Sequence, residues 1–327
     1  MATFGLEEEV FVVDPEKPSL KSLYYLTKLL WRDPKFNYYN TASNFSRGRD
    51  MIQSLMSGVE VATGIHSKAA SAVSELKARR RELDGVVTDG LIVPIGHLIN
   101  LVAPTNVCAL QFHIGGVKDQ EKTYRNLLHF LPVLVLMTIN APYAGREYKG
   151  QSYRMAASFA VGPILPDKTD RFQDMIVSKR LKTIEIRVFD PVWDIRRVET
   201  LANAIEAVVA LKQELKPDIS RYNVLRSRIA RNGYIRELKP IYDELKQIAD
   251  VPEEMLVKTA SDEIKEMYED VGLLATYSAM DNGYRTGVFE HRRIPDSKST
   301  TLKAAAGLAG YYMPKLPYVL YKYIRES

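Results

Sequence analysis

The chain has 327 residues, of which 46% are hydrophobic and 26% charged, as in globular proteins with one large domain or two smaller ones. Its 45 basic and 40 acidic residues nearly balance, and no basic tail carries the net charge of +5, so we expect no nucleic-acid partner. Cys108 is the only cysteine, which excludes an internal disulfide and a cysteine-rich metal motif.

The hydrophobic pattern gives no sign of a leader or a membrane anchor. The chain opens directly into a strand-like segment, with no basic and apolar leader before it, so no signal peptide is expected. The longest apolar run, from Leu127 to Ile139, contains His129 and Pro132 and is too short to cross a membrane. We therefore expect a soluble, cytoplasmic protein with no membrane partner.

Strands and helices alternate irregularly in the first two thirds of the chain. Segments rich in Val, Ile and Phe predict strands over Phe4–Val13, Gly58–Thr63, Val86–Ile95, Val107–Gly115 and Thr183–Phe189. Helical patterns cover Leu20–Trp31, Ser67–Leu83, Asp119–Ile139 and Arg196–Leu215, then Ile219–Arg231, Tyr234–Ile248, Glu253–Glu269 and a tail after Leu302. The basic run Lys77–Arg81 is interpreted as a solvated helix face.

Strands scattered among helices, without a repeating βαβ rhythm, predict an α+β fold. The strongest candidate for an internal boundary is Pro217, after which only helices are expected. A continuous helical layer packed on one domain fits the pattern equally well.

The first predicted strand carries two carboxylates on one face. Residues two apart on a strand point the same way, so Glu7 and Glu9 project together, opposite an apolar face. Neighbouring carboxylates repel each other, and a divalent cation removes that repulsion by giving both the same partner. The alternative is an ordinary solvated outer face of a sheet.

Three further strands show the same division between an apolar and a polar face. The polar faces carry Glu185 with Arg187, Gln111 with His113, and Glu60. Carboxylates and an imidazole suit Mg²⁺ or Mn²⁺, and the planar fork of arginine suits phosphate. This pattern predicts a nucleotide–metal site, although the sequence contains no G-x-x-x-x-G-K-[ST] loop, no H-E-x-x-H and no G-x-S-x-G.

Five segments occur in order along the chain, TFGLEEEVFVVD, SLMSGVEVATG, CALQFHIGG, NAPYAGREYKGQSYRMA and TIEIRVFDP. Together they resemble the glutamate–cysteine ligase family, in its bacterial and archaeal carboxylate–amine ligase branch, and the likeness runs from Thr3 to about Lys212. The resemblance implies a glutamine-synthetase-like fold, with a mainly antiparallel curved sheet, helices packed on it and the site on the concave face. It implies a single ligase-like domain over residues 1–327, sheet-bearing to about 216 and helical over about 217–327.

The resemblance also implies roles for particular residues. Glu7, Glu9, Glu60 and Glu185 match metal-binding carboxylates, with Gln53, Gln111 and His113 as further metal candidates. Arg154 and Arg187 match catalytic positions that hold phosphate or a substrate carboxylate, and Ser152 lies in the segment expected to bind the nucleotide. The implied cofactors are ATP and Mg²⁺ or Mn²⁺. The implied substrates are an amino-acid carboxylate, glutamate in the family, and a small amine. A homodimer is the default expectation for such an enzyme.

The chemistry implied is transfer of the ATP γ-phosphoryl group to the carboxylate, giving an acyl phosphate that the amine converts to an amide. Two positions depart from the family pattern, because Gln53 replaces an acid and Gln111 replaces a histidine. Losing one carboxylate about 4 Å from a cation forfeits roughly 4 kcal/mol at an effective dielectric of about 20. The alternatives are thus an active ligase, a degenerate member that binds nucleotide or a partner without ligating, and an unrelated metal-dependent enzyme.

Overall fold

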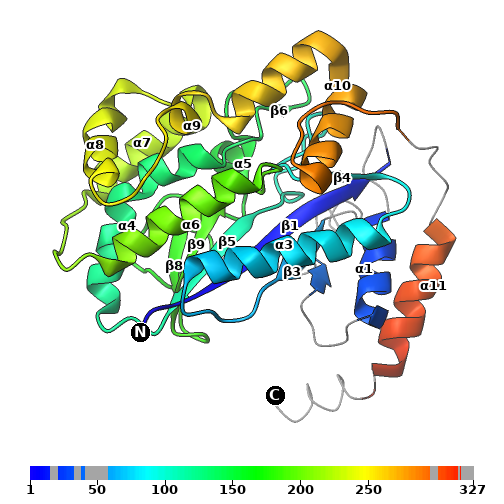
Figure 1. Cartoon of the computed structure of the whole chain (residues 1–327), viewed down its shortest axis with the longest axis horizontal. Helices are drawn as coiled ribbons and strands as arrows, with labels where there is room; N and C mark the ends of the chain where they lie inside the picture. The colour runs from blue at the N-terminus through cyan, green and yellow to red at the C-terminus, as the bar shows by residue number, and fades with distance from the viewer. Residues whose placement is uncertain (15–20, 33–37, 41–57, 295–300, 316, 318–327) are drawn as a thin grey trace.

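The computed structural model describes residues 1–14, 21–32, 38–40, 58–294, 301–315 and 317 (Figure 1). Its main feature is a seven-stranded sheet with the path β2-β3-β1-β5-β9-β8, in which β4 also pairs with β1. The strands are β1 (Thr3–Val13), β2 (Tyr38–Asn40), β3 (Val59–Ala62), β4 (Leu91–Val93), β5 (Leu110–Gly115), β8 (Met175–Ser178) and β9 (Thr183–Phe189). All of these pairings are antiparallel.

Helices pack against the sheet and against one another. They are α1 (Lys21–Arg32), α3 (Ala69–Val86), α4 (Gln120–Leu134), α5 (Tyr153–Ala157), α6 (Ile195–Ala210), α7 (Ile219–Asn232), α8 (Lys239–Lys246), α9 (Glu254–Val257), α10 (Ala260–Thr286) and α11 (Thr301–Tyr312). Helix α3 contacts β1 and α6, and α6 contacts α4, so these helices form a layer over the sheet (Figure 1). The predicted α+β fold with a mainly antiparallel sheet is confirmed.

Several short elements were not predicted from the sequence. These are β2, β8, α5 and the hairpin of β6 (Tyr143–Ala144) with β7 (Tyr148–Lys149). The predicted strand Val86–Ile95 shrinks to β4, because α3 continues to Val86. Each missed element spans at most five residues, too few to show a period of its own.

The predicted helix Glu253–Glu269 is two helices. Helix α9 ends at Val257, and Thr259 then caps α10 through a reciprocal capping box with Asp262. Helix α10 runs on to Thr286 across a kink at Gly272, where φ is 79° and ψ is −179°. Within the described residues after Pro217 there are helices and no strand, as expected, while the division into parts stays a prediction.

The back of β1 carries a charge that the sequence pattern did not assign. Glu8 lies on the same face as Leu6 and Val10 and is fully buried. Both of its carboxylate oxygens accept hydrogen bonds from Arg80 of α3, with Nε to Oε2 at 2.9 Å. The hydroxyl of Tyr284 lies 3.3 Å from Oε2. A buried carboxylate is thus matched by a buried guanidinium, which is the condition for tolerating either in a core.

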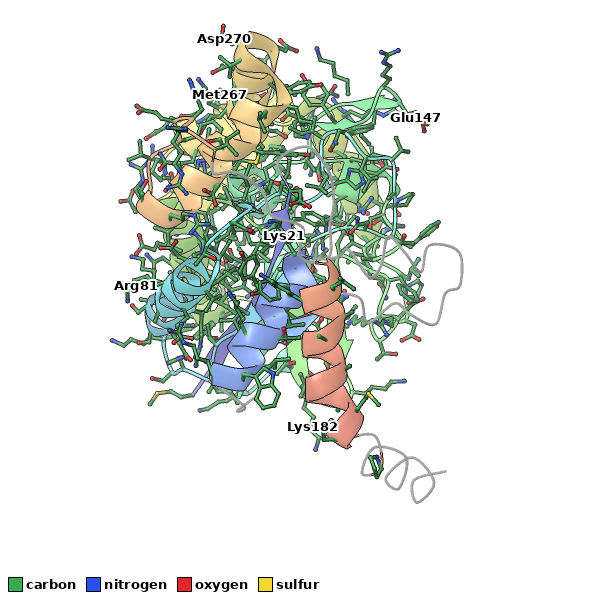
Figure 2. All side chains as sticks on the ribbon, turned by 90° about the vertical axis from the view of Figure 1, so that its right-hand side faces the viewer. Lys21, Arg81, Glu147, Lys182, Met267 and Asp270 are labelled. Carbon is green, nitrogen blue, oxygen red and sulfur yellow. The ribbon has the colours of Figure 1, made fainter. Side chains whose placement is uncertain are left out.

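The interpretation of Lys77–Arg81 as a solvated face is wrong at Arg80. This side chain is only 5% exposed and also donates to the carbonyls of Val192, at 2.8 Å, and Trp193, at 3.2 Å. Arg80 falls on the buried stripe of α3 with Leu76 and Leu83, because helix positions three and four apart share a face. Arg81 is exposed and projects from α3 at the molecule's edge (Figure 2).

Glu8→Gln tests this buried pair. The change is nearly isosteric but leaves the Arg80 guanidinium buried without an opposite charge, so we expect the free energy of unfolding to fall by about 3–5 kcal/mol. Urea denaturation followed by circular dichroism measures the loss. The double variant Glu8→Leu/Arg80→Met should recover most of it. A loss below about 1 kcal/mol, the range of exposed pairs, would contradict the assigned role of the pair.

Candidate active site

The strand register places the predicted acidic residues on one face of the sheet. Glu9 of β1 lies directly opposite Glu60 of β3, and Glu7 lies opposite Gln111 of β5. Residues directly opposite across two strands point to the same face. His113 lies opposite Glu185 of β9, so the face carries Glu7, Glu9, Glu60, Gln111, His113, Glu185 and Arg187. Gln53 lies outside the described residues.

Glu9 and Glu60 form an electrostatically strained pair on neighbouring strands. Burial raises the pKa of Glu9 to about 7, although Arg154 and Arg187 act against this shift. Burial and repulsion from Glu9 and Glu7 raise the pKa of Glu60 well above its usual range. The folded protein therefore resists placing full negative charge on both carboxylates, and a cation beside them would remove that resistance.

Glu7 is partly neutralised by an imidazole. Nε2 of His113 lies 3.2 Å from Oε2 of Glu7. Burial alone would raise the pKa of Glu7, but His113 and Arg187 outweigh it and hold this pKa below its usual value. Burial alone would lower the pKa of His113, and Glu7 reverses that shift so that the pKa is raised. The two side chains therefore favour the charged form of each other.

Arg187 is held in place by its neighbours on the same face. One terminal nitrogen donates to Gln111 Oε1 at 3.1 Å and also to the carboxylate of Glu185. Gln111, where the family pattern has a histidine, is thus a neutral acceptor that orients the guanidinium. This contact gives the departure at Gln111 a local structural role.

Arg154 and Ser152 lie at the start of α5, where Arg154 contacts the backbone of β9. One terminal nitrogen of Arg154 donates to the carbonyl of Val188 at 2.8 Å, and the other to the carbonyl of Arg187 at 2.6 Å. Ser152 caps α5 and donates to Oδ2 of Asp190 at 3.1 Å. Arg154 is only 2% exposed, and both of its terminal nitrogens donate to carbonyls of β9. The binding and catalytic roles of Arg154 and Ser152 stay predictions.

Asp190 is a residue of this region that sequence reasoning did not single out. It is fully buried, and its Oδ2 also accepts the N–H of Asn140 at 3.1 Å. Its Oδ1 lies 3.5 Å from Arg154, so it joins α5, β9 and the segment before β6. An acid directly before Pro191, at the end of a buried strand, was the available signal.

The fit of this face to a divalent cation depends on which of its carboxylates are free of other partners. Within the described ranges, no three His, Cys, Asp or Glu side chains lie together as a group that could hold a metal ion. Glu185 is turned to Arg187 and Glu7 to His113, which leaves Glu9 and Glu60 as the carboxylates with raised pKa values. Carboxylate oxygens are the donors that Mg²⁺ and Mn²⁺ prefer, so the chemistry of the donor set fits.

Buried polar atoms without partners gather on this side of the sheet. Among the described side chains, Nδ1 of His113, Nε of Arg187, Nε of Arg154 and Oγ1 of Thr183 are buried with no hydrogen bond. Such atoms are uncommon in native proteins, and they are available to hydrogen-bond a ligand bound at this face. A cavity of about 270 Å³, lined in part by Glu7, His113 and Thr183, opens beside them.

Comparison with known proteins gives a family context for this geometry. No known protein-family model matches the chain. A curated protein from Bradyrhizobium sp. (strain ORS 278), named "Putative glutamate--cysteine ligase 2", is 24% identical over 332 residues, covering 84% of this chain and 78% of that protein. In sequence, the chain is thus similar to a protein named as a glutamate–cysteine ligase, which is a carboxylate–amine ligase.

Solved structures agree with this family at the level of the fold. Glutamate–cysteine ligase from Francisella tularensis, in complex with AMP, matches with a TM-score of 0.54 and 12% identity, over 94% of this chain and 93% of that one. A bifunctional glutathione synthetase from Pasteurella multocida matches with a TM-score of 0.54 and 10% identity, over 95% of this chain and 53% of that one. Among the described residues of the present chain, no helix is both long and apolar enough to span a membrane.

Glu9→Gln tests the strain at the acidic pair. Because the pKa of Glu9 is raised in the folded state, the folded protein keeps the proton of Glu9 between pH about 4.5 and about 7, where the unfolded chain has lost it. The parent should therefore lose stability as the pH rises through this range. One such group contributes a slope of at most about 1.4 kcal/mol per pH unit. In metal-free buffer at pH 8 we expect Glu9→Gln to raise the free energy of unfolding and to flatten this slope.

Urea denaturation at several pH values in excess EDTA measures the effect. Glu8→Gln is the matched control, because the same chemical change one residue away should lower stability. If Glu9→Gln also destabilises the protein at pH 8, the acidic pair is not strained and the account of this face is wrong.

Proposed function

We propose that this protein is an ATP- and Mg²⁺- or Mn²⁺-dependent carboxylate–amine ligase that forms a γ-glutamyl-type amide through an acyl phosphate. The observation that carries the proposal is the acidic pair Glu9 and Glu60 on the same sheet face as the oriented guanidinium of Arg187. A cation and an arginine on one face are what a reaction that moves a phosphoryl group requires.

In this proposal Glu9 and Glu60 would hold a divalent cation, with Glu7 and Glu185 beside them on the same face. When bound, such a cation supplies positive charge near the phosphate oxygens of ATP. The protein adds the guanidinium of Arg187, whose buried Nε has no partner among the described residues. Gln111 and Glu185 hold this guanidinium before any substrate arrives, so little reorganisation is needed when charge develops.

The bond changes then follow two steps. A carboxylate oxygen of the acid substrate attacks the γ-phosphorus of ATP, the bond to the bridging oxygen breaks, and ADP leaves. The amine nitrogen attacks the carbonyl carbon of the acyl phosphate, and phosphate departs as the amide forms and the amine loses its proton. Arg187 binds and orients the phosphoryl group, whose charge is spread over its oxygens throughout.

The cavity of about 270 Å³ supports a place for the nucleoside of ATP. It adjoins Glu7 and His113, and its lining includes Ile65 and Leu181, apolar side chains that are 83% and 48% exposed. Exposed apolar side chains beside a cavity favour a flat, partly apolar group such as a nucleobase. The AMP complex of the Francisella enzyme supports nucleotide binding by this fold.

Glutamate as the acid and a small amine as the acceptor are proposed from the kind of relative that matches, a glutamate–cysteine ligase. A dicarboxylate such as glutamate needs positive charge near the site. Arg154 and Arg187 supply such charge, because both lower the pKa of Glu9 by attraction.

Arg187→Met is the direct functional test. The assay is ATP-dependent amide formation and phosphate release with Mg²⁺, glutamate and a panel of small amines. Removing a preorganised cationic donor from a phosphoryl-transfer site costs about 100- to 1,000-fold in kcat, and we expect a loss of that size. Arg196→Met is the matched control, because Arg196 is exposed at the start of α6, and it should keep full turnover.

If the folded parent binds ATP but shows no turnover with any acid–amine pair, the ligase proposal fails and a nucleotide-binding role remains. Equal turnover by the parent and Arg187→Met would leave the ligase activity standing but remove Arg187 from the site.

A further inference from the structure

A second cavity has features that the ligase proposal does not use. It has a volume of about 510 Å³ and lies where the start of β1, the turn between β5 and α4, and the end of α6 meet. Phe4, Val117, Val209 and Leu211 give it apolar walls. Its size falls within the range of small-molecule sites in proteins.

The charged side chains that line this cavity are mostly basic. They comprise four lysines and two acids, Asp119 and Glu206. Oδ1 of Asp119 accepts the N–H of Lys122 at 2.9 Å, and Oε2 of Glu206 accepts the N–H of Ala69 at 2.9 Å. Each acid is therefore engaged by backbone at the start of a helix, and neither is paired with a lysine side chain of the cavity.

Three of the four lysines are free to meet a ligand. Lys122 donates to the carbonyl of Leu211 at 3.1 Å and so forms part of the wall. Lys68, Lys118 and Lys212 are exposed and form no ion pair with any described residue. They come from three separate segments that meet at this cavity, which gives an apolar space bordered by positive charge.

We propose that this cavity binds a small organic anion with an apolar body, of the size of a medium-chain carboxylate. The anionic group would lie among Lys68, Lys118 and Lys212, and the hydrocarbon against Phe4 and Leu211. Charge complementarity selects an anion, and the apolar walls select against small hydrophilic anions such as acetate. Phe4 also lines the cavity beside Glu7, so the two cavities share a wall.

The experiment is a fluorescence titration with 1-anilinonaphthalene-8-sulfonate, an apolar anion that brightens when bound in an apolar site. Octanoate should displace it from the full-length protein, whereas acetate and octylamine, which lack the apolar body and the negative charge respectively, should not. We expect Lys118→Glu/Lys212→Glu to weaken binding of the dye by about tenfold or more. The control Lys246→Glu/Lys303→Glu makes the same change in net charge at other exposed positions and should leave binding unchanged.

Val209→Trp provides a second variant that fills the cavity without changing its charge, and it should also abolish binding. Saturating ATP tests whether the dye lies instead beside Glu7, and under the proposal ATP should not displace it. Equal loss in the two lysine pairs, retention of binding in Val209→Trp, or displacement by octylamine would overturn the proposal. Circular dichroism confirms the fold of each variant, so failure to fold cannot imitate loss of the site.

Discussion

Side chains alternate between the two faces of β1, and this alternation decides which of its glutamates enter the core and which reach the candidate site. Three consecutive glutamates, Glu7 to Glu9, cannot all point the same way on a strand, so the middle one enters the core. Arg80 of α3 meets Glu8 there, which anchors the helical layer to the centre of the sheet. The same geometry sends Glu7 and Glu9 to the opposite face, where the candidate site lies.

The carboxylates on the two faces of β1 differ in how completely their charges are paired. Behind the strand the charge of Glu8 is matched by one guanidinium and a tyrosine hydroxyl. On the front, four carboxylates from three strands share Arg187 and His113, and Glu9 and Glu60 keep raised pKa values. A core gains from complete pairing, whereas a site that binds a cation needs carboxylates that are not already satisfied. The molecule shows this contrast across the thickness of one strand.

Much of this arrangement could be predicted from the sequence because a strand has a short and rigid period. Apolar alternation around Glu9, Glu185 and His113 was enough to place them on polar faces, and the antiparallel register then brought them together. The resemblance to carboxylate–amine ligases implied the antiparallel sheet and the face that carries the candidate site. The polar faces were predicted from the two-residue period of the strands, and the fold from the likeness of five whole segments.

Other features depend on contacts between distant residues and were out of reach. The helical stripe with Leu76 and Leu83 marks the buried face of Arg80, but the carboxylate that matches its charge, Glu8, lies 72 positions earlier and cannot be found from local sequence. Arg154 was predicted to bind phosphate or a substrate carboxylate, and its terminal nitrogens donate to the backbone of β9. Only the folded chain reveals these hydrogen bonds. Strand β8 is too short to show alternation, and the predicted helix ended at Glu269, so the kink at Gly272 and the continuation of α10 to Thr286 were missed.

The melting temperatures of the parent and of Glu9→Gln, each measured with Mg²⁺ or Mn²⁺ and ATP together, decide whether the acidic face of the sheet binds a cation. A ligand that binds the folded state alone stabilises it by about 2.7 kcal/mol at 100 times its Kd. The account predicts a clear rise for the parent at millimolar metal and nucleotide, and loss of most of that rise in Glu9→Gln. An equal rise in both proteins, or no rise in the parent, would contradict the claim that the acidic face of the sheet is built around a cation.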